Sequence, residues 1–215
     1  EQQIGAPLFE RGASEIKTTP LGEQVVAQIK RVLDEALRLE EIATQSRDPL
    51  KGALRVGVIY TIAPYLLPAL IPVLHKLAPD MPLFLREDFT HNLIPALKDG
   101  DLDVLVLALP VDIPGVVTQK VYEEPFRVVV PAGHDWAKRS AIKNDELDGE
   151  HLLLLGSGNC FRDQVLEACP RLQRAEGLSG SLEGSSLETI RHMVASGAGI
   201  AVMPSSAADP LVGRE

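Results

Sequence analysis

The sequence has 215 residues, of which 45% are hydrophobic and 24% are charged. This balance predicts a packed globular protein of one or two domains with a sizeable core. The net charge of −9 excludes nucleic-acid binding over the bulk of the chain, because phosphates attract clustered Lys and Arg, so any DNA contact is expected to be local.

Targeting signals and membrane segments are not found in the sequence. No apolar run reaches the roughly 18 to 20 residues of a membrane span, and the opening stretch EQQIGAPLFERG lacks the basic and apolar regions of a signal peptide. We therefore expect a cytoplasmic protein with no membrane partner. Thiols are normally kept reduced there, so the two cysteines are expected to be structural, metal-binding or redox-reactive rather than a permanent disulfide.

The first residues predict a β-wing that leads into a helix. Two short extended pieces flank the turn at Gly12-Ala13-Ser14. Thr19-Pro20 then suits an N-cap followed by proline at the first helical position.

The helix that follows, over residues 20–46, carries a heptad pattern. Its apolar residues recur at spacings of 4, 3, 4, 3 and 4: Val25, Ile29, Val32, Ala36, Leu39 and Ala43. Some 26 helical residues are roughly 40 Å long, and this apolar stripe is narrow, so the pattern predicts a dimerisation helix. A helix that packs on its own core is the alternative.

After the polar linker SRDPLKG, strand-like and helix-like segments alternate, which predicts an α/β fold. Strands are expected at 53–60, 82–88, 103–109, 126–131, 151–155 and 199–204, and helices near 64–78, 91–99, 161–169 and 186–197. Nearly wholly apolar strands such as 103–109 predict sheets covered on both faces.

Motifs for nucleotide, hydrolase and metal chemistry are missing from the sequence: it contains no P-loop, no His-Glu-x-x-His and no Gly-x-Ser-x-Gly. The five histidines show no metal-ligand spacing with a cysteine, so we expect neither a metal nor a cofactor. His91 remains a candidate because it follows Thr90 at a strand-to-helix junction. The turn LGSGNC at 155–160 is a generic cradle for a polar ligand.

The chemistry of Cys160 suggests a reactive thiol. Asn159 can cap the helix that begins at Cys160, and backbone N–H groups and the Arg162 guanidinium of the same turn would then lower the thiol pKa. A small buried core residue is the alternative. Taken alone, Cys169 fits a core position better than a reactive one, and Thr61 and Thr90 fit helix caps.

Several segments resemble LysR-type transcriptional regulators. GAPLFERGASEIKTTPLG is similar to the end of their winged helix-turn-helix domain, the long helix resembles their linker helix, and SSLETIRHMVASGAGIAVMP is similar to part of their effector domain. GNCFRDQVLEAC, with YTIAPYLLP and THNLIPAL, resembles the peroxide-sensing OxyR branch.

This resemblance implies a domain organisation. Residues 1–19 correspond to the remnant of the DNA-binding domain, 20–46 to the linker helix, and 52–126 and 127–215 to subdomains I and II of a two-lobed, periplasmic-binding-protein-like effector domain. Both ends of the regulator are expected to be incomplete. The implied partners are promoter DNA and RNA polymerase, and the chain is expected to form a homodimer or homotetramer.

The resemblance also implies roles for individual residues. Cys160 would react with hydrogen peroxide and Cys169 would then close a disulfide with it. Peroxide would be held by Thr61 and Thr90, and the site would include His91, Asn159, Arg162 and Asp163. Asn159 departs from the family, which commonly has histidine before the reactive cysteine.

The spacing of the cysteines has a geometric consequence. If residues 160–169 are helical, the two Cα atoms lie roughly 13 Å apart, whereas a disulfide needs about 7 Å or less. The helix would therefore have to unfold for the bond to form. The remaining alternatives are a LysR-type regulator that binds an organic effector, a two-lobed solute-binding protein, and a thiol peroxidase.

Overall fold

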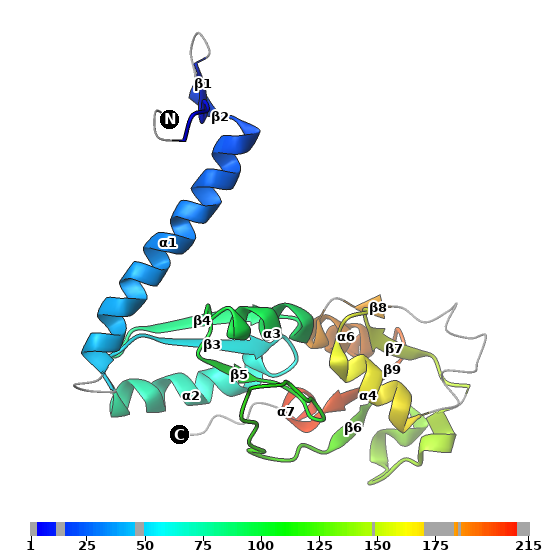
Figure 1. The fold of residues 1–215 in the computed structure, drawn as a ribbon. Helices are drawn as coiled ribbons and strands as arrows, with labels where there is room; N and C mark the ends of the chain where they lie inside the picture. The colour runs from blue at the N-terminus through cyan, green and yellow to red at the C-terminus, as the bar shows by residue number, and fades with distance from the viewer. Residues whose placement is uncertain are drawn as a thin grey trace. The chain divides into compact units, whose positions relative to one another are not determined.

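The computed structural model describes residues 4–11, 16–45, 50–147, 149–169, 183–184 and 186–209 (Figure 1). The chain divides into two compact units, one of residues 1–53 with 78–82 and the other of residues 54–77 with 83–215. Within the described residues, no helix is long and apolar enough to cross a membrane.

The first unit contains a short hairpin followed by a long helix. Strands β1 (Phe9–Arg11) and β2 (Ile16–Thr18) pair antiparallel, and α1 covers Pro20–Gln45. The Thr19 hydroxyl accepts a hydrogen bond from the Gly22 N–H at 2.9 Å, so the predicted N-cap is confirmed. Gly22 allows close packing, because a Cβ there would lie 2.1 Å from the Leu8 carbonyl oxygen. The predicted wing turn lies outside the described residues.

The apolar stripe of α1 faces solvent in the single chain. Ile29, Val32 and Leu39 are 49%, 60% and 70% exposed. Val25 is half-buried and Ala36 is exposed, while the side chain of Ala43 lies outside the described part. Within this unit, the described side chains of the stripe do not form part of a buried core.

The second unit begins with a three-stranded parallel sheet, which we name lobe I. Strands β3 (Leu54–Ile59), β4 (Leu83–Asp88) and β5 (Val104–Val106) follow the order β4-β3-β5. Helices α2 (Ala63–Leu77) and α3 (Thr90–Lys98) cover opposite faces (Figure 1). Alternation along β3 explains this arrangement, because Val56 and Val58 pack with α2 whereas Ile59 packs with α3.

The expectation of a strand over 103–109 with both faces covered is wrong. Strand β5 ends at Val106, and Val104 and Leu109 are 47% and 41% exposed. The physical reason is position: β5 is at the edge of the described sheet, and the residues after it line an open groove. Apolar composition alone does not distinguish an edge strand from a central one.

The described residues from Phe126 onward form a four-stranded sheet with its helices, which we name lobe II. Strands β6 (Phe126–Val129), β7 (Leu152–Leu155), β8 (Glu183–Gly184) and β9 (Ile200–Pro204) follow the order β6-β9-β7-β8, with only β6 antiparallel to its neighbour. Helices α4 (Cys160–Ala168), α6 (Leu187–Ala195) and α7 (Ser205–Ala208) pack on it. All residues of β7 and β9 are buried, so here the predicted coverage of both faces is confirmed.

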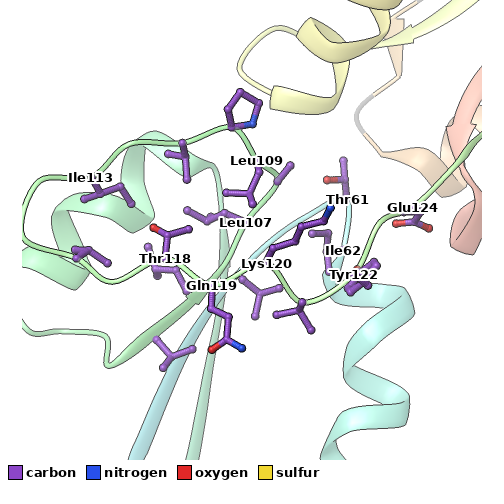
Figure 2. Close-up of a pocket in the computed structure, with 18 of the residues that line it drawn as sticks. Thr61, Ile62, Leu107, Leu109, Ile113, Thr118, Gln119, Lys120, Tyr122 and Glu124 are labelled. Atoms are coloured by element: carbon purple, nitrogen blue, oxygen red, sulfur yellow. The ribbon is translucent and has the colours of Figure 1, made fainter.

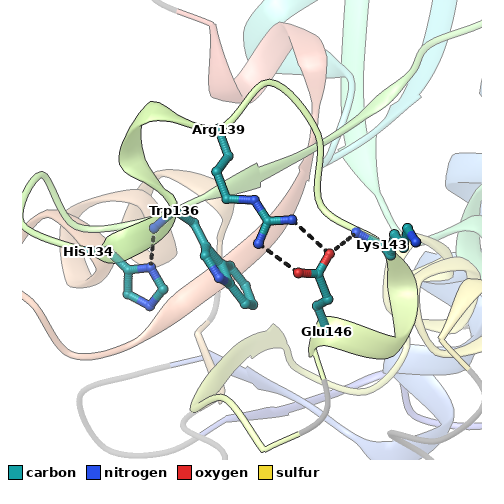
Figure 3. A network of polar contacts seen from close by, with 5 residues as sticks. All are labelled: His134, Trp136, Arg139, Lys143 and Glu146. Carbon is teal, nitrogen blue, oxygen red and sulfur yellow. Dashed lines mark hydrogen bonds and ion pairs between the residues drawn. The ribbon is translucent and has the colours of Figure 1, made fainter.

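A polar network organises the loop between β6 and β7. Arg139 donates to both carboxylate oxygens of Glu146 at 2.6 and 3.0 Å, and the Lys143 N–H donates to the same carboxylate (Figure 3). The Arg139–Glu146 pair links two short 3₁₀ helices, because Arg139 follows η1 (Asp135–Lys138) and Glu146 lies in η2 (Asn144–Leu147). The Arg139 guanidinium lies over the Trp136 ring, 6.0 Å from its centroid. Trp136 packs against the core of lobe II.

Candidate functional site

The two candidate threonines lie at equivalent positions at the end of the lobe I sheet. Strands β3 and β4 run parallel, with Ile59 paired to Asp88. Thr61 and Thr90 each follow two residues later, so both hydroxyls lie at the same carboxyl-end edge, where ligands of parallel sheets usually bind. Thr61 is 5% exposed, and the Thr90 hydroxyl oxygen is also buried.

Neither threonine occupies a helix N-cap position. Phe89 is the N-cap of α3 and Thr90 its first residue, while Thr61 lies two residues before the start of α2. The interpretation of these threonines as helix caps is therefore wrong. The two junctions differ in length: a turn of residues 60–62 separates β3 from α2, whereas Phe89 alone separates β4 from α3.

Cys160 belongs to lobe II in sequence and to lobe I in packing. It is the first residue of α4, yet its side chain packs against the lobe I cluster formed around Ile59 and Leu93. Close to it, the Thr90 hydroxyl makes no hydrogen bond of ordinary geometry to a described polar atom, but it is near enough to the thiol to affect its pKa.

Burial raises the pKa of the Cys160 thiol above its ordinary value, which contradicts the lowered pKa predicted from the sequence. The Thr90 hydroxyl and the backbone N–H groups of Phe161 and Cys160 lower it, as expected at a helix N-terminus, while the Asp163 carboxylate raises it further. Desolvation is the largest of these effects. The resting thiol is therefore held mainly in its protonated, weakly nucleophilic form.

Arg162 and Asn159 both donate to backbone carbonyl oxygens of residues that precede α4. The Arg162 guanidinium donates to the Leu155 carbonyl oxygen at 2.7 Å. Asn159 precedes α4 in extended conformation, as an N-cap should, but its side-chain amide donates to the Gly156 carbonyl oxygen at 2.9 Å and does not cap the helix. Both side chains stabilise the turn before Cys160, because their hydrogen-bond acceptors are the carbonyl oxygens of residues just before that turn or within it.

His91 lies beside this turn, on the lobe I side. Its ring stacks on Phe89, with centroids 5.5 Å apart and planes 8° from parallel. Gly158 has a φ of +94°, and a Cβ there would lie 3.8 Å from the Phe89 ring and 3.9 Å from the His91 ring. The turn thus approaches His91 closely through a residue without a side chain, while Asp163 lies exposed in the first turn of α4.

Cys169 lies at the other end of α4, in a different core. It follows the last helical residue and is 5% exposed, packed in the lobe II cluster with Phe161 and Val165. Both cysteines are thiols in the structure, and the predicted helix between them is confirmed. Its length places their Cα atoms about 13 Å apart, too far for a disulfide.

A groove adjoins the site. Its volume is about 1810 Å³, and it is lined mainly by apolar residues of the extended segment 103–124, with Thr61 at the lobe I sheet (Figure 2). Phe161 and Gln164 of α4 also line it. The Gln164 side-chain amide donates to the Leu109 carbonyl oxygen at 3.0 Å, so α4 is tied to lobe I at a second point. Sequence reasoning missed Gln164; its only signal was its place in the Arg-Asp-Gln stretch.

Comparisons with known proteins identify the family of this chain. The family model of the LysR substrate binding domain matches residues 47–215. Escherichia coli K12 OxyR, described as a DNA-binding transcriptional dual regulator, is 36% identical over 98% of this chain and 68% of its own length. The chain belongs to the LysR-type regulators, in their OxyR branch.

Solved structures of OxyR proteins share the fold. The reduced regulatory domain of Pseudomonas aeruginosa OxyR is 52% identical over 74% of each chain, with a TM-score of 0.67. A hydrogen peroxide-bound cysteine mutant of Corynebacterium glutamicum OxyR is 33% identical over 96% of this chain and 65% of that one, with a TM-score of 0.71. These likenesses support the two-lobed, periplasmic-binding-protein-like α/β architecture.

Proposed function

We propose that this protein is a cytoplasmic DNA-binding transcription regulator that senses hydrogen peroxide through Cys160 and records the signal as a Cys160–Cys169 disulfide. One observation carries the proposal. The Cys160 thiol lies between lobe II and the threonine-bearing edge of lobe I, while Cys169 is buried at the far end of the same helix in a separate core. The peroxide-bound relative supports this choice of ligand.

Hydrogen peroxide is the oxidant in the proposed reaction of Cys160. The Cys160 thiolate attacks one peroxide oxygen, the O–O bond breaks, and the leaving hydroxide takes a proton to become water, which leaves a sulfenic acid on Cys160. Thr61 and Thr90 can each donate to and accept from the peroxide oxygens. The Cys169 thiol then attacks the sulfenic sulfur, an S–S bond forms and a second water leaves.

Disulfide formation would change the fold locally. Because the helix separates the two cysteines, α4 must unfold and Phe161 and Val165 must leave the lobe II core. Burial of each such side chain contributes roughly 1.5–3 kcal/mol, which opposes the change. The strongly downhill condensation of the sulfenic acid offsets this cost. We propose that the refolded segment alters subunit contacts and, through the linker helix, the DNA-binding domains.

The proposed partners follow from this scheme. Promoter DNA binds through the winged domain whose end is represented by residues 1–19, RNA polymerase responds at the promoter, and the protein acts as a homodimer or homotetramer through α1 and its effector domains. The regulator uses no cofactor, metal or membrane. It is a sensor rather than an enzyme, so each subunit consumes one peroxide and remains oxidised until a thiol reductant acts.

The test is mass spectrometry of both thiols after a brief exposure to low-micromolar peroxide. Wild type should show the disulfide. Cys160→Ser should show no oxidation, and Cys169→Ser should stop at a sulfenic acid on Cys160, which dimedone can trap. If Cys160 remains reduced in wild type, the proposal is wrong.

The threonine cradle is tested with the same assay. Thr61→Val and Thr90→Val keep the side-chain shape but remove a polar partner of peroxide, so Cys160 oxidation should slow while the fold survives. Thr118→Val, in the exposed segment that lines the groove, is the matched control and should react like wild type. Unchanged rates in both cradle variants would mean that these hydroxyls do not hold peroxide.

One further candidate function has an observation in its favour. The apolar groove beside Thr61 is large enough for an organic effector, so the protein can alternatively be a LysR-type regulator in which the cysteines are incidental. A protein that peroxide leaves reduced, but that an organic ligand protects against thermal unfolding, would favour this function. A thiol peroxidase would instead consume many equivalents of peroxide in the presence of a dithiol.

A further inference from the structure

Tyr65 belongs to lobe I but packs in lobe II. It lies in the first turn of α2, the helix that contributes Ala63 and Leu67 to the lobe I core. Its ring nevertheless contacts the hydrophobic core of lobe II. The Tyr65 hydroxyl donates a hydrogen bond of 3.0 Å to the Glu188 carboxylate at the start of α6. Tyr65 therefore joins the lobes with both an apolar and a polar contact.

Charged groups around Tyr65 and Glu188 fix the geometry of the hydrogen bond between them. One Glu188 carboxylate oxygen accepts the hydrogen bond from the Tyr65 hydroxyl, and the other accepts a hydrogen bond of 2.6 Å from the Arg191 guanidinium. Burial and the neighbouring Glu188 raise the Tyr65 pKa, so the phenol stays protonated and remains a donor. Arg191 is itself partly enclosed, with a buried Nε that has no hydrogen-bond partner among the described residues. The Glu188 carboxylate is therefore oriented by two donors.

At the candidate site, residues of lobe II contact lobe I, which is the reverse of the Tyr65 contact. Cys160 and Gln164 of α4 contact lobe I, through the Ile59–Leu93 cluster and the Leu109 carbonyl oxygen. The two threonines are on lobe I, whereas the thiol is on lobe II. Their alignment thus depends on how the lobes are held together, and Tyr65 holds them without using any residue of α4.

We propose that Tyr65 is a positioning residue for the peroxide reaction, holding lobe I and lobe II so that the threonine edge faces the Cys160 thiol. This inference rests on the proposed function. The Tyr65–Glu188 bond does not touch the reacting atoms; it limits the relative movement of the two lobes that supply them. Because α4 takes no part in it, the bond can also persist when oxidation unfolds that helix.

The test compares two reactions of the same thiol in Tyr65→Phe, which removes the hydroxyl and keeps the ring. Oxidation by peroxide needs the threonines aligned with Cys160, whereas alkylation by iodoacetamide needs only an accessible thiolate. Peptide mass spectrometry measures both rates at Cys160. Oxidation should fall about five- to tenfold, the order expected for losing one hydrogen bond, while alkylation stays the same or increases.

Control variants separate positioning from a general structural effect. Glu188→Gln keeps an acceptor oxygen for Tyr65 and should oxidise at close to the wild-type rate, whereas Glu188→Leu should resemble Tyr65→Phe. The double variant Tyr65→Phe with Glu188→Leu should be no slower than either single variant, because both remove the same bond. Ser196→Ala removes an exposed hydroxyl at the end of α6, outside the groove, and should change neither rate.

The outcomes are distinguishable. If wild type reacts with peroxide and Tyr65→Phe reacts equally fast, the inference is overturned and the proposed function stands. It is also overturned if oxidation and alkylation fall by the same factor, because the change then acts on the thiol in general. If wild type itself is not oxidised, the proposed function fails, and the inference with it.

Discussion

The Cys160 thiol combines partial burial in an apolar cluster with the N-terminus of a helix, and these two influences on its pKa oppose each other. Desolvation favours the neutral thiol, whereas the backbone N–H groups and the Thr90 hydroxyl favour the thiolate. Since burial is the larger effect, the thiol is mainly protonated in the resting protein and reacts slowly with general electrophiles. We therefore expect a fast reaction only with a ligand that binds beside the Thr61 and Thr90 hydroxyls.

This balance predicts a pH dependence for Cys160. Only the thiolate reacts, and its fraction increases about tenfold per pH unit below the pKa. Because the pKa is raised, the alkylation rate of Cys160 should still increase at pH values where that of glutathione has levelled off. Asp163→Asn removes a charge that raises this pKa and should speed alkylation at pH 7 by about twofold. A rate that is already flat above pH 6 would contradict the raised pKa.

Gly57 is a second residue whose environment leads to a prediction. A Cβ at this position would lie 2.6–2.9 Å from methyl groups of Leu105, Leu102 and Leu93. Gly57→Ala should therefore lower the free energy of unfolding by about 1–3 kcal/mol, as measured by urea denaturation, because the lobe I core has no space for the methyl group.

Gly133→Ala is the matched control for this substitution. Nothing lies within 4 Å of a Cβ at Gly133, so its free energy of unfolding should stay close to that of wild type. Equal stabilities for the two variants would mean that α3 and β5 pack less tightly against β3 than the structure shows.

At the scale of secondary structure, α4 is the element on which the proposed switch depends. Its first residue packs in lobe I, its buried face packs in lobe II, and the two thiols lie at its opposite ends. The helix has only nine residues, and helices this short have little intrinsic stability and depend on tertiary packing. An element stabilised mainly by its contacts can be refolded by one new covalent bond.

Unfolding of α4 should be visible at Trp136, the only tryptophan in the sequence. Trp136 packs against the lobe II core that Phe161, Val165 and Cys169 would leave. On addition of peroxide its fluorescence emission should shift to longer wavelength, as water enters this core, and it should recover on addition of a dithiol. Cys160→Ser should show no shift. An unchanged spectrum in a sample whose disulfide is confirmed by mass spectrometry would contradict the refolding.

At the scale of the whole molecule, the long helix α1 carries an apolar stripe that the single chain leaves exposed. Ile29 and Val32 lie in its middle and are 49% and 60% exposed. A second copy of the chain can bury such a heptad stripe by coiled-coil packing. We therefore expect at least a dimer, in both the reduced and the oxidised form.

Sedimentation velocity tests this assembly. The double variant Ile29→Lys with Val32→Lys places charges within the stripe and should shift the protein toward monomer at low-micromolar concentration. Gln24→Lys with Ala27→Lys adds the same charge on the outer face of the helix and should sediment like wild type. Identical sedimentation of all three proteins would mean that another surface holds the subunits together.

Local patterns were sufficient for the elements and for the choice of candidate residues. Heptad spacing, proline after threonine, and short apolar runs bounded by Gly and Pro predicted α1 and the α/β lobes, because periodicity and capping are properties of neighbouring residues. The helix between Cys160 and Cys169 was predicted for the same reason, and with it the distance that keeps the two thiols apart.

Tertiary structure decided the chemistry at the boundary between the lobes. The sequence could not show that Cys160 leaves its own lobe to pack beside Leu93, and desolvation by that remote cluster reversed the predicted pKa shift. Nor could it show that Arg162 turns to Leu155, or that Tyr65 and Glu188, 123 positions apart, meet. Burial and hydrogen bonding at these positions depend on segments far away in the chain, and only the folded arrangement of both lobes brings those segments together.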